Sequence, residues 1–363
     1  MAHIISKCYF HIVTSLFLLP RFKSITLSEF LHSVWGMKMK RGLRCYAVTG
    51  CVALAMLFLY VCDFTYISAF LNNKVPVHKP QLFWDDVKDK FDHSRPRVMV
   101  SWKGRLGNHM FEYATLIGVA EKYNFTPIIT SDLDVLEVFN LPTPQGSYDL
   151  LRNPITYKEE MAAKYSSVFE RFDKNRDTYF DGYLQSWKYY NHIREKLLKE
   201  HFVFHRNIQE TAERYIANVL AERKMEGATV VAVHVRRGDF VRQRVKGFTV
   251  APIPYYYRAM DYMRKKFKNV LFIICTNDFV WAETYLDSGP DIHYSHETDQ
   301  ALDMALMVNS HHIVITSGSY SYWAGYLVRG EVVYYAGYPK PNTIIGNQTV
   351  REDYYPPWWK AMW

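Results

Sequence analysis

Cysteine is almost absent from the long C-terminal part of this 363-residue chain. Four of its five cysteines, Cys8, Cys45, Cys51 and Cys62, lie near the N-terminus, and only Cys275 follows them. A single thiol cannot form a disulfide bond within its own segment, so a hydrophobic core must hold together everything after Cys62. The composition allows such a core, because 49% of the residues are hydrophobic and 16% are aromatic. These fractions exclude a disordered chain.

Several motifs that would indicate a familiar enzyme class are missing. The chain has no zinc-ligand spacing, no Gly-x-Ser-x-Gly nucleophile motif and no protein-kinase motif set. The glycine turn GRLGN at 104–108 lacks the third glycine of a dinucleotide fingerprint and is not a P-loop.

A uniformly basic surface is missing as well, although the formal net charge is +8. Residues 1–62 hold seven Lys and Arg against one Glu, a balance of +6, which leaves +2 for the other residues. The positive excess therefore indicates membrane topology and gives no reason to expect a nucleic-acid partner.

One apolar run is present, CYAVTGCVALAMLFLYVC at 45–62, with 18 uncharged residues. This length is close to what a hydrocarbon core requires. Because basic residues precede the run, we predict a cytoplasmic tail over 1–44, a signal anchor over 45–62 and a lumenal remainder that begins with a stem over 63–95. A cleaved signal peptide is the alternative, but the run is long and has no clear small-residue cleavage site. Met37 and Met39 are alternative starts of the functional protein.

Two N-glycosylation sequons follow the apolar run, at Asn124 and Asn347. Asn347 lies in a polar, turn-rich stretch and is the better candidate. Asn124 directly precedes the apolar segment FTPIIT.

Short apolar runs alternate with helical patterns through the rest of the chain. Strands are predicted at 97–102, 126–130, 229–235, 270–276, 312–317 and 331–335. Helices are predicted from residue 110 onward and at 186–200, 207–224, 254–267, 279–286, 298–310 and 320–330. This alternation predicts an α/β protein with two Rossmann-like, doubly wound domains that face a cleft. Their expected ranges are 96–224 and 225–340, followed by a C-terminal tail over 341–363.

The segment VAVHVRRGDFV at 231–241 carries the strongest chemical signal, because a buried-type strand continues directly into Arg236 and Arg237. Two adjacent guanidinium groups need an anionic partner, and a diphosphate would pair with both. Asp239 would then orient one arginine. The alternative is an ordinary Arg–Asp surface pair, and His234 is equally compatible with a hydrogen-bonded histidine of the core.

Four weaker patterns accompany it. Ser317, Gly318 and Ser319 stand where a strand passes into a helix, which suits either an anion site or simple capping. Gly107 and Asn108 occupy a similar turn in the first half, where a tight turn with Asn108 as the cap is the alternative.

The DLD segment at 132–134 resembles the Asp-x-Asp metal ligands of some glycosyltransferases, but helical spacing of the following apolar residues favours a capped helix start. The C-terminal YYPPWWKAMW suits sugar stacking or, more simply, a packed tail.

Taken in order, these segments resemble the galactoside α-1,2-fucosyltransferases and, more loosely, other fucosyltransferases that form α-1,2 and α-1,6 linkages. HVRRGD at 234–239 is similar to the family's donor motif, and GRLGNHMFEYATL at 104–116 is similar to its N-terminal motif. The segments at 275–286 and 298–327 resemble two later motifs. The resemblance implies a GT-B-like type II Golgi membrane enzyme that transfers L-fucose from GDP-fucose to O2 of a terminal galactose on glycoprotein or glycolipid glycans. It implies inversion at the anomeric carbon and neither a metal ion nor another cofactor.

The resemblance also implies site residues. Arg236 and Asp239 would be catalytic, and Asp239, Glu297 and Asp299 are the candidates for a general base. The expected donor-binding residues are Gly107, Asn108, His234, Arg236, Arg237, Asp278, Asp299, Ser317, Gly318 and Ser319.

Departures from the family pattern concern the acceptor more than the donor. His109 stands where the family usually has Gln, and Ser319-Tyr320 differs from its common Thr-Phe or Ser-Phe. Two other functions stay open at this point: a metal-dependent glycosyltransferase that uses Asp132 and Asp134, and a non-catalytic carbohydrate-binding membrane protein.

Overall fold

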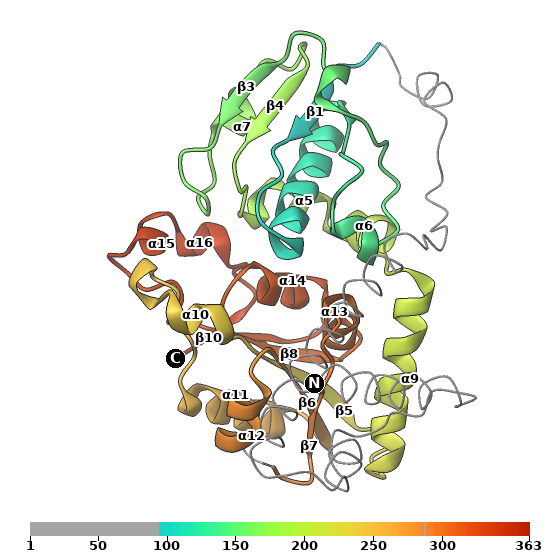
Figure 1. Ribbon diagram of the computed structural model, residues 1–363, viewed down its shortest axis with the longest axis vertical. Helices are drawn as coiled ribbons and strands as arrows, with labels where there is room; N and C mark the ends of the chain where they lie inside the picture. Colours follow the sequence, from blue (N-terminus) through green and yellow to red (C-terminus); the bar gives the residue numbers. More distant parts are fainter. Residues whose placement is uncertain (1–93, 287) are drawn as a thin grey trace, which may run out of the picture. The chain divides into compact units, whose positions relative to one another are not determined.

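The computed structural model describes residues 94–286 and 288–363 of the chain (Figure 1). The predicted cytoplasmic tail and membrane anchor, and nearly all of the predicted stem, lie outside these residues. Within the described residues, no helix is both long enough and apolar enough to cross a membrane. The described part contains two β-sheets with helices packed beside them.

The first sheet has four strands in the order β2-β1-β4-β3, and all neighbouring pairs are parallel. Helix α5 (Leu106–Tyr123) connects β1 to β2. All four residues of β1 are buried, as is usual for a central strand with helices or chain on both faces. The strands are β1 (Arg97–Val100), β2 (Thr126–Pro127), β3 (Ile155–Lys158) and β4 (Thr178–Asp181), with the short helices α6 (Val135–Val138) and α7 (Val168–Arg171) in the connections.

The second sheet has six strands in the order β10-β9-β8-β5-β6-β7, again with all neighbouring pairs parallel. The predicted strands 229–235 and 270–276 match the observed strands β5 and β6, because continuous burial leaves an apolar run of the same length. The strands are β5 (Thr229–Val235), β6 (Val270–Thr276), β7 (Ile292–Tyr294), β8 (His312–Ile315), β9 (Val332–Tyr335) and β10 (Lys360–Met362). The helices of this half are α9 (Arg206–Glu222), α10 (Gly238–Arg242), α11 (Ile253–Lys266), α12 (Phe279–Tyr285), α13 (Gln300–Val308) and α14 (Ser319–Leu327).

Two predicted elements of the first half differ from the structure. The predicted strand 126–130 is regular only at β2, although Ile129 also forms an isolated bridge with Gln145. The predicted helix 186–200 is broken into two 3₁₀ turns, α8 (Arg194–Lys196) and a π-helical turn. The cause is tertiary contact: the backbone at Tyr189 lies so close to α5 that a Cβ at Gly118 would be 2.4 Å from its carbonyl oxygen.

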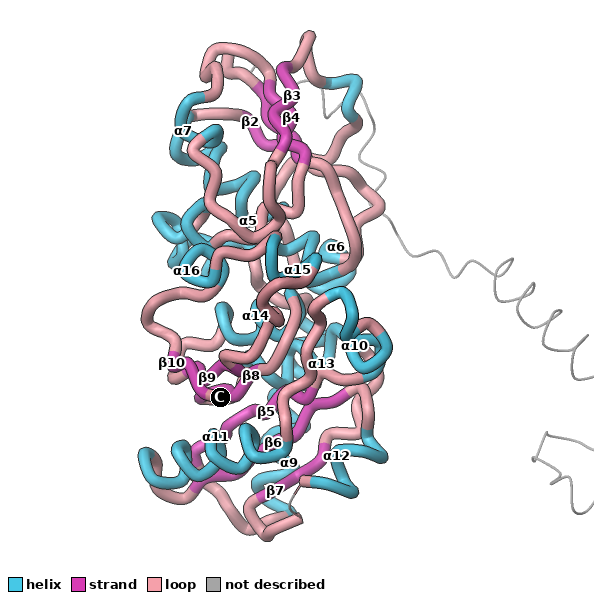
Figure 2. The backbone as a smooth tube through the Cα atoms, turned by 90° about the vertical axis from the view of Figure 1, so that its left-hand side faces the viewer, coloured by secondary structure: helices cyan, strands magenta, loops and turns pink. Residues whose placement is uncertain are grey.

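The domain boundaries also need correction. Helix α9, which we assigned to the first domain, packs against α13 of the second half. The predicted tail 341–363 is not a tail, because β10 pairs with β9 and completes the second sheet. Between these strands the chain passes through α15 (Ile344–Asn347) and α16 (Arg351–Tyr354), which Figure 2 shows level with α5 and α14, between the two sheets. A three-residue strand leaves no recognisable period in the sequence.

The segment between β9 and β10, residues 336–359, passes to the first half and back, and we call it the C-terminal crossing. It is hydrogen-bonded to the first half. The backbone N–H of Ala163 donates to the carbonyl oxygen of Gln348 at 2.9 Å, and that of Val350 donates back to Ala163 at 2.9 Å. Lys188 forms an ion pair with Asp353 at 2.6 Å. The C-terminal segment therefore binds both halves.

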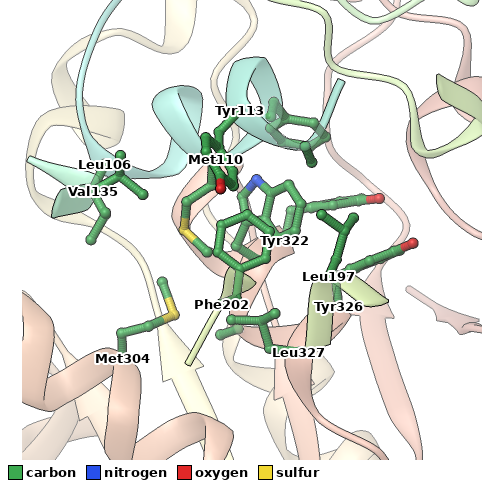
Figure 3. Close-up of a cluster of buried hydrophobic side chains, with 14 of the residues drawn as sticks. Leu106, Met110, Tyr113, Val135, Leu197, Phe202, Met304, Tyr322, Tyr326 and Leu327 are labelled. Atoms are coloured by element: carbon green, nitrogen blue, oxygen red, sulfur yellow. The ribbon is translucent and has the colours of Figure 1, made fainter. Parts of the chain in front are cut away.

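One hydrophobic core continues through both halves, with α5 and α14 at its centre. The Phe111 ring of α5 lies 4.5 Å from the Tyr322 ring and 5.2 Å from the Trp323 ring, measured between centroids. Figure 3 shows Met110 and Tyr113 of α5 facing Tyr322 and neighbouring side chains of α14. The two halves are therefore packed together by buried aromatic side chains and not merely linked by loops.

The two adjacent tryptophans near the C-terminus test the role of this segment. Trp359 is 7% exposed and contacts the Tyr322 and Tyr334 rings, whereas Trp358 is 50% exposed. We expect Trp359→Ala to lower the free energy of unfolding by about 3–5 kcal/mol, since it empties a core position. Trp358→Ala serves as the matched control and should cost much less. Urea denaturation of the two purified variants measures the difference, and equal losses would contradict a core role for Trp359.

Candidate active site

A cavity of about 630 Å³ lies between the two halves. The N-terminal ends of α5 and α14 meet at its wall. A Cβ added at Gly107 would lie 2.5 Å from the backbone nitrogen of Tyr320, so only glycine permits this approach. Neither helix has a side-chain cap, and their N-terminal ends direct partial positive charge toward the same region. The lining also includes His234, Arg236, Asp239, Phe240, Thr276, Asn277, Phe279, Glu297, Thr298, Gln300, Asp303, Ser317, Gly318, Ser319 and Tyr320.

Arg236 points into this cavity from the end of β5. Its Nη2 donates to Oδ1 of Asp239 at 2.7 Å, and its guanidinium lies 5.1 Å from the Phe240 ring centroid. Burial lowers the pKa of the Arg236 guanidinium, Asp239 opposes this shift, and the positive charge of Arg105 adds to it. Arg236 and Arg105 are therefore two cationic groups of the lining, and Asp239 is the carboxylate paired with Arg236.

Arg237 points elsewhere, which corrects the expectation that both arginines face one ligand. Its Nε donates to Oδ2 of Asp278 at 3.1 Å, and its guanidinium stacks 3.8 Å from the Trp281 ring centroid. Neither Arg237 nor Asp278 lines the cavity. The reason is the backbone after β5: Arg237 follows the end of the strand and is the N-cap residue of α10, with φ −134° and ψ −95°.

Arg105 is a cavity residue that the sequence analysis missed. It precedes α5, lines the cavity and is exposed. Among the described residues, no ion pair with its side chain is found. The only sign of it in the sequence is its position inside GRLGN, where the two glycines are the more obvious candidates.

His234 combines the two roles that the sequence left open. It is 3% exposed, its Nδ1 is hydrogen-bonded to the hydroxyl of Ser321, and it also lines the cavity. Burial, with the charge of Arg236 acting in the same direction, lowers the pKa of His234 to about 3. The ring is therefore neutral in the folded protein at ordinary pH.

The side chains of Ser317, Ser319 and Asn108 do not cap α14 or α5, although capping was the simpler alternative for these positions. Ser317 donates its hydroxyl hydrogen to the Thr249 carbonyl at 2.6 Å, and Ser319 begins α14 beside Gly318, whose φ is +93°. Asn108 lies inside α5 and accepts a hydrogen bond from Nε2 of Gln185 at 3.0 Å. All of these except Thr249 line the cavity.

The acidic candidates separate into two groups. Asp299 and Asp278 accept hydrogen bonds from backbone N–H groups at the starts of α13 and α12, so both are helix caps, and neither lines the cavity. Glu297 does line it, and its Oε1 accepts from the N–H groups of Thr298 and Asp299. Only Asp239 and Glu297 of the three proposed bases are therefore in the cavity.

Asp303 is a second residue that the sequence analysis missed. It lines the cavity, it accepts a hydrogen bond from the Tyr320 hydroxyl at 3.3 Å, and its buried Oδ1 has no partner among the described residues. Burial raises the pKa of Asp303 to about 7. A lone acid within the apolar run ALDMALM was the available signal.

The Asp-x-Asp alternative finds no support in the placement of its residues. Asp134 pairs with Nδ1 of His109 at 2.5 Å and makes no capping hydrogen bond, so the expected helix cap is wrong as well. Neither Asp132 nor Asp134 lines the cavity. Within the described residues, no three His, Cys, Asp or Glu side chains converge as a metal site.

Both sequon asparagines are exposed in the structure. Asn124 ends α5 with a left-handed φ of 60°. Asn347 ends α15, directly before Gln348 and Thr349, which line the cavity. Glycosylation at either position stays a prediction.

The model of glycosyl transferase family 11 matches residues 66–362. The chain belongs to this family. The galactoside 2-alpha-L-fucosyltransferase Sec1 of Mus musculus is 31% identical over 265 residues, which is 71% of each chain. The galactoside alpha-(1,2)-fucosyltransferase 2 of Hylobates lar is 28% identical over 280 residues, which is 74% of this chain and 80% of the relative.

The comparison with solved structures matches NodZ and POFUT1. The NodZ alpha-1,6-fucosyltransferase soaked with GDP-fucose superimposes with a TM-score of 0.43 at 13% identity, over 67% of this chain and 96% of that one. POFUT1 in complex with GDP-fucose gives a TM-score of 0.43 at 10% identity, over 66% and 98%.

Two glutamates of the family 11 chain, one buried and one half-buried, lie behind the first-half wall of the cavity. Glu112 of α5 is 0% exposed and accepts the Lys103 N–H, while the half-buried Glu159 accepts the N–H groups of Tyr183 and Leu184. Burial raises the pKa of Glu112 to about 9 and that of Glu159 to about 8. Both carboxyls therefore hold a proton in the folded protein at neutral pH.

This burial predicts a pH dependence of stability. Because the folded-state pKa of Glu112 is far above its ordinary value of 4.5, its contribution is fully present at low pH and is lost as pH rises through about 9. Between these values it lowers the free energy of unfolding by about 1.4 kcal/mol per pH unit. Glu112→Gln should flatten this slope, measured by urea denaturation at several pH values. Glu137→Gln, at an exposed glutamate, is the control, and an unchanged slope in Glu112→Gln would contradict the expectation.

Proposed function

We propose that this chain is a type II Golgi membrane enzyme that transfers L-fucose from GDP-fucose to O2 of a terminal galactose on glycoprotein or glycolipid glycans, with inversion and without a metal ion. One observation carries the proposal: Arg236, half-buried and paired with Asp239, lies in the cavity where the uncapped N-termini of α5 and α14 meet. This arrangement suits a diphosphate leaving group. Membership of family 11 and the printed activities of its relatives support the sugar and the linkage.

The chemistry follows from the placement of Arg236. As the bond between fucose C1 and the β-phosphate oxygen breaks, positive charge grows on the sugar ring and negative charge on the phosphate. The Arg236 guanidinium and the backbone N–H groups of the two helix starts stabilise the phosphate charge from fixed positions. The acceptor hydroxyl attacks the opposite face of C1, which converts a β-linked donor into an α-linked product, and the proton of that hydroxyl leaves to a base or to water.

Asp239 acts mainly as the partner of Arg236. Its Oδ1 accepts from Nη2 at 2.7 Å, so it orients the guanidinium toward the cavity. Leaving-group stabilisation then dominates the reaction, and base assistance is secondary.

The expected nucleotide follows from the proposed donor, GDP-fucose, which is supported by the fucosyltransferase activities printed for relatives in family 11. GDP should therefore raise the melting temperature of the chain, and UDP should not, since only a bound ligand shifts unfolding by mass action.

A panel of nucleotide sugars with a β-galactoside acceptor tests the reaction itself. We expect transfer from GDP-fucose alone, an α-1,2-linked product by NMR, and unchanged rates in EDTA. Loss of transfer in EDTA would favour the metal-dependent alternative. Sugar binding without release of nucleotide would favour the carbohydrate-binding protein.

The two adjacent arginines provide a matched pair of variants. Arg236→Lys keeps the charge but loses the planar fork, so transfer should fall about 10²–10³-fold while the melting temperature changes little. Arg237→Lys loses the contacts with Asp278 and Trp281, so the melting temperature should fall while turnover per folded molecule stays close to that of the wild type. Rates and melting curves are measured on the same preparations, and near-normal transfer by Arg236→Lys would refute its catalytic role.

A further inference from the structure

Part of the cavity lining comes from the first half and from the C-terminal crossing. This part includes Ala162, Tyr183, Gln185, Ile345, Gln348 and Thr349. None of these side chains is a carboxylate or a cation. Two amides, a hydroxyl and a phenol ring form a neutral, hydrogen-bonding surface, which matches the chemistry of an uncharged sugar.

Two glutamines in this region lie on either side of Ala162. The backbone N–H of Gln185 donates to the Ala162 carbonyl at 2.9 Å, and the Ala162 N–H donates to Oε1 of Gln348 at 3.3 Å. Hydrogen bonds through Ala162 therefore link the backbone of Gln185 to the side chain of Gln348, and both residues line the cavity. Sequence patterns could not indicate this, because the juxtaposition depends on the crossing of the C-terminal segment.

Each glutamine retains hydrogen-bonding capacity. Nε2 of Gln185 donates to Asn108 at 3.0 Å, and Oε1 of Gln348 accepts from Ala162. Across the described ranges 94–286 and 288–363, no partner is found for the Gln185 amide oxygen or for the Gln348 amide nitrogen. One free acceptor and one free donor suit the vicinal hydroxyls of a hexose, each of which can donate and accept.

Glu159, which does not line the cavity, fixes the backbone of this wall. Glu159 accepts the N–H groups of Tyr183 at 2.8 Å and Leu184 at 3.0 Å. The bond from Gln185 to Asn108 connects the wall to the start of α5, where Gly107 meets α14. A sugar on this wall would therefore lie beside the site that we assign to the leaving diphosphate.

We propose that Gln185 and Gln348 form the acceptor subsite and select the terminal galactose through hydrogen bonds to its hydroxyls, with the Tyr183 ring beside them. This inference rests on the proposed function. It assigns acceptor selectivity jointly to the first half and to the C-terminal crossing, and it assigns donor binding to neither glutamine.

Steady-state transfer to methyl β-galactoside and to its 3-, 4- and 6-deoxy derivatives tests the subsite. At saturating GDP-fucose, Gln185→Ala and Gln348→Ala should each raise KM for the galactoside about tenfold, the usual effect of losing one hydrogen bond to a neutral group. The affinity for GDP, measured by calorimetry, should stay within about twofold of the wild-type value. Gln145→Ala, at an exposed glutamine outside the cavity, is the matched control and should leave both quantities unchanged.

The deoxy sugars separate direct contact from a structural role. For the wild type, removing the contacted hydroxyl should lower kcat/KM about tenfold, and in the corresponding glutamine variant the same removal should cost almost nothing further. Equal penalties in wild type and both variants would overturn the inference, as would unchanged KM values. If Gln185→Ala does not fold, the exposed Gln348 still gives the answer. Failure of the wild type to transfer to any galactoside would overturn the proposed function itself, while a wild type that transfers and glutamine variants that behave normally would overturn only the subsite.

Discussion

The contact between Gly107 and the start of α14 is the constraint on which the rest of the structure depends. A Cβ at this position would lie 2.5 Å from the Tyr320 nitrogen and 2.7 Å from the Ser319 carbonyl carbon. Without a side chain, two helices from different halves place their N-termini against each other. Behind this contact the aromatic core of Phe111 and Tyr322 joins the halves, and in front of it lies the cavity. The same glycine therefore determines both the packing and the position of the site.

Charges of both signs meet at this junction. The two helix starts, Arg236 and Arg105 contribute positive charge, while Asp239, Glu297 and Asp303 line the same cavity. Burial lowers the pKa of Arg236, because desolvation disfavours the charged guanidinium. Under the proposed function, the departing diphosphate would gain negative charge beside this guanidinium, and an interaction that strengthens in the transition state is the kind that accelerates a reaction.

The sequence predicts the second half better than the first, for physical reasons. Strands β5 and β6 are buried on both faces, so they leave continuous apolar runs of the right length. The first half has short strands and broken helices whose course is set by backbone contacts such as Gly118 with Tyr189. Of the donor-binding residues predicted from motifs, Arg236, His234 and Gly107 line the cavity. Arg237 does not, because it lies past the end of β5 at the N-cap of α10 and contacts Asp278 and Trp281. Asp278 and Asp299 do not line it either, since their side chains cap helices. The positions of Gln348 and β10 could not be predicted from the sequence, since they depend on contacts between distant segments.

The chain crosses between the halves twice, first through the segment that leads into α9 and then through the C-terminal segment that returns to the second sheet as β10. The second crossing pairs with Ala163 on its way and supplies Gln348 and Thr349 to the cavity wall. Because the halves also share one aromatic core, opening the cavity by a hinge would break buried contacts as well as hydrogen bonds. The geometry that stabilises charge is therefore already present before a ligand binds. For a reaction that depends on fixed donors around a leaving group, such preorganisation is the property that matters most.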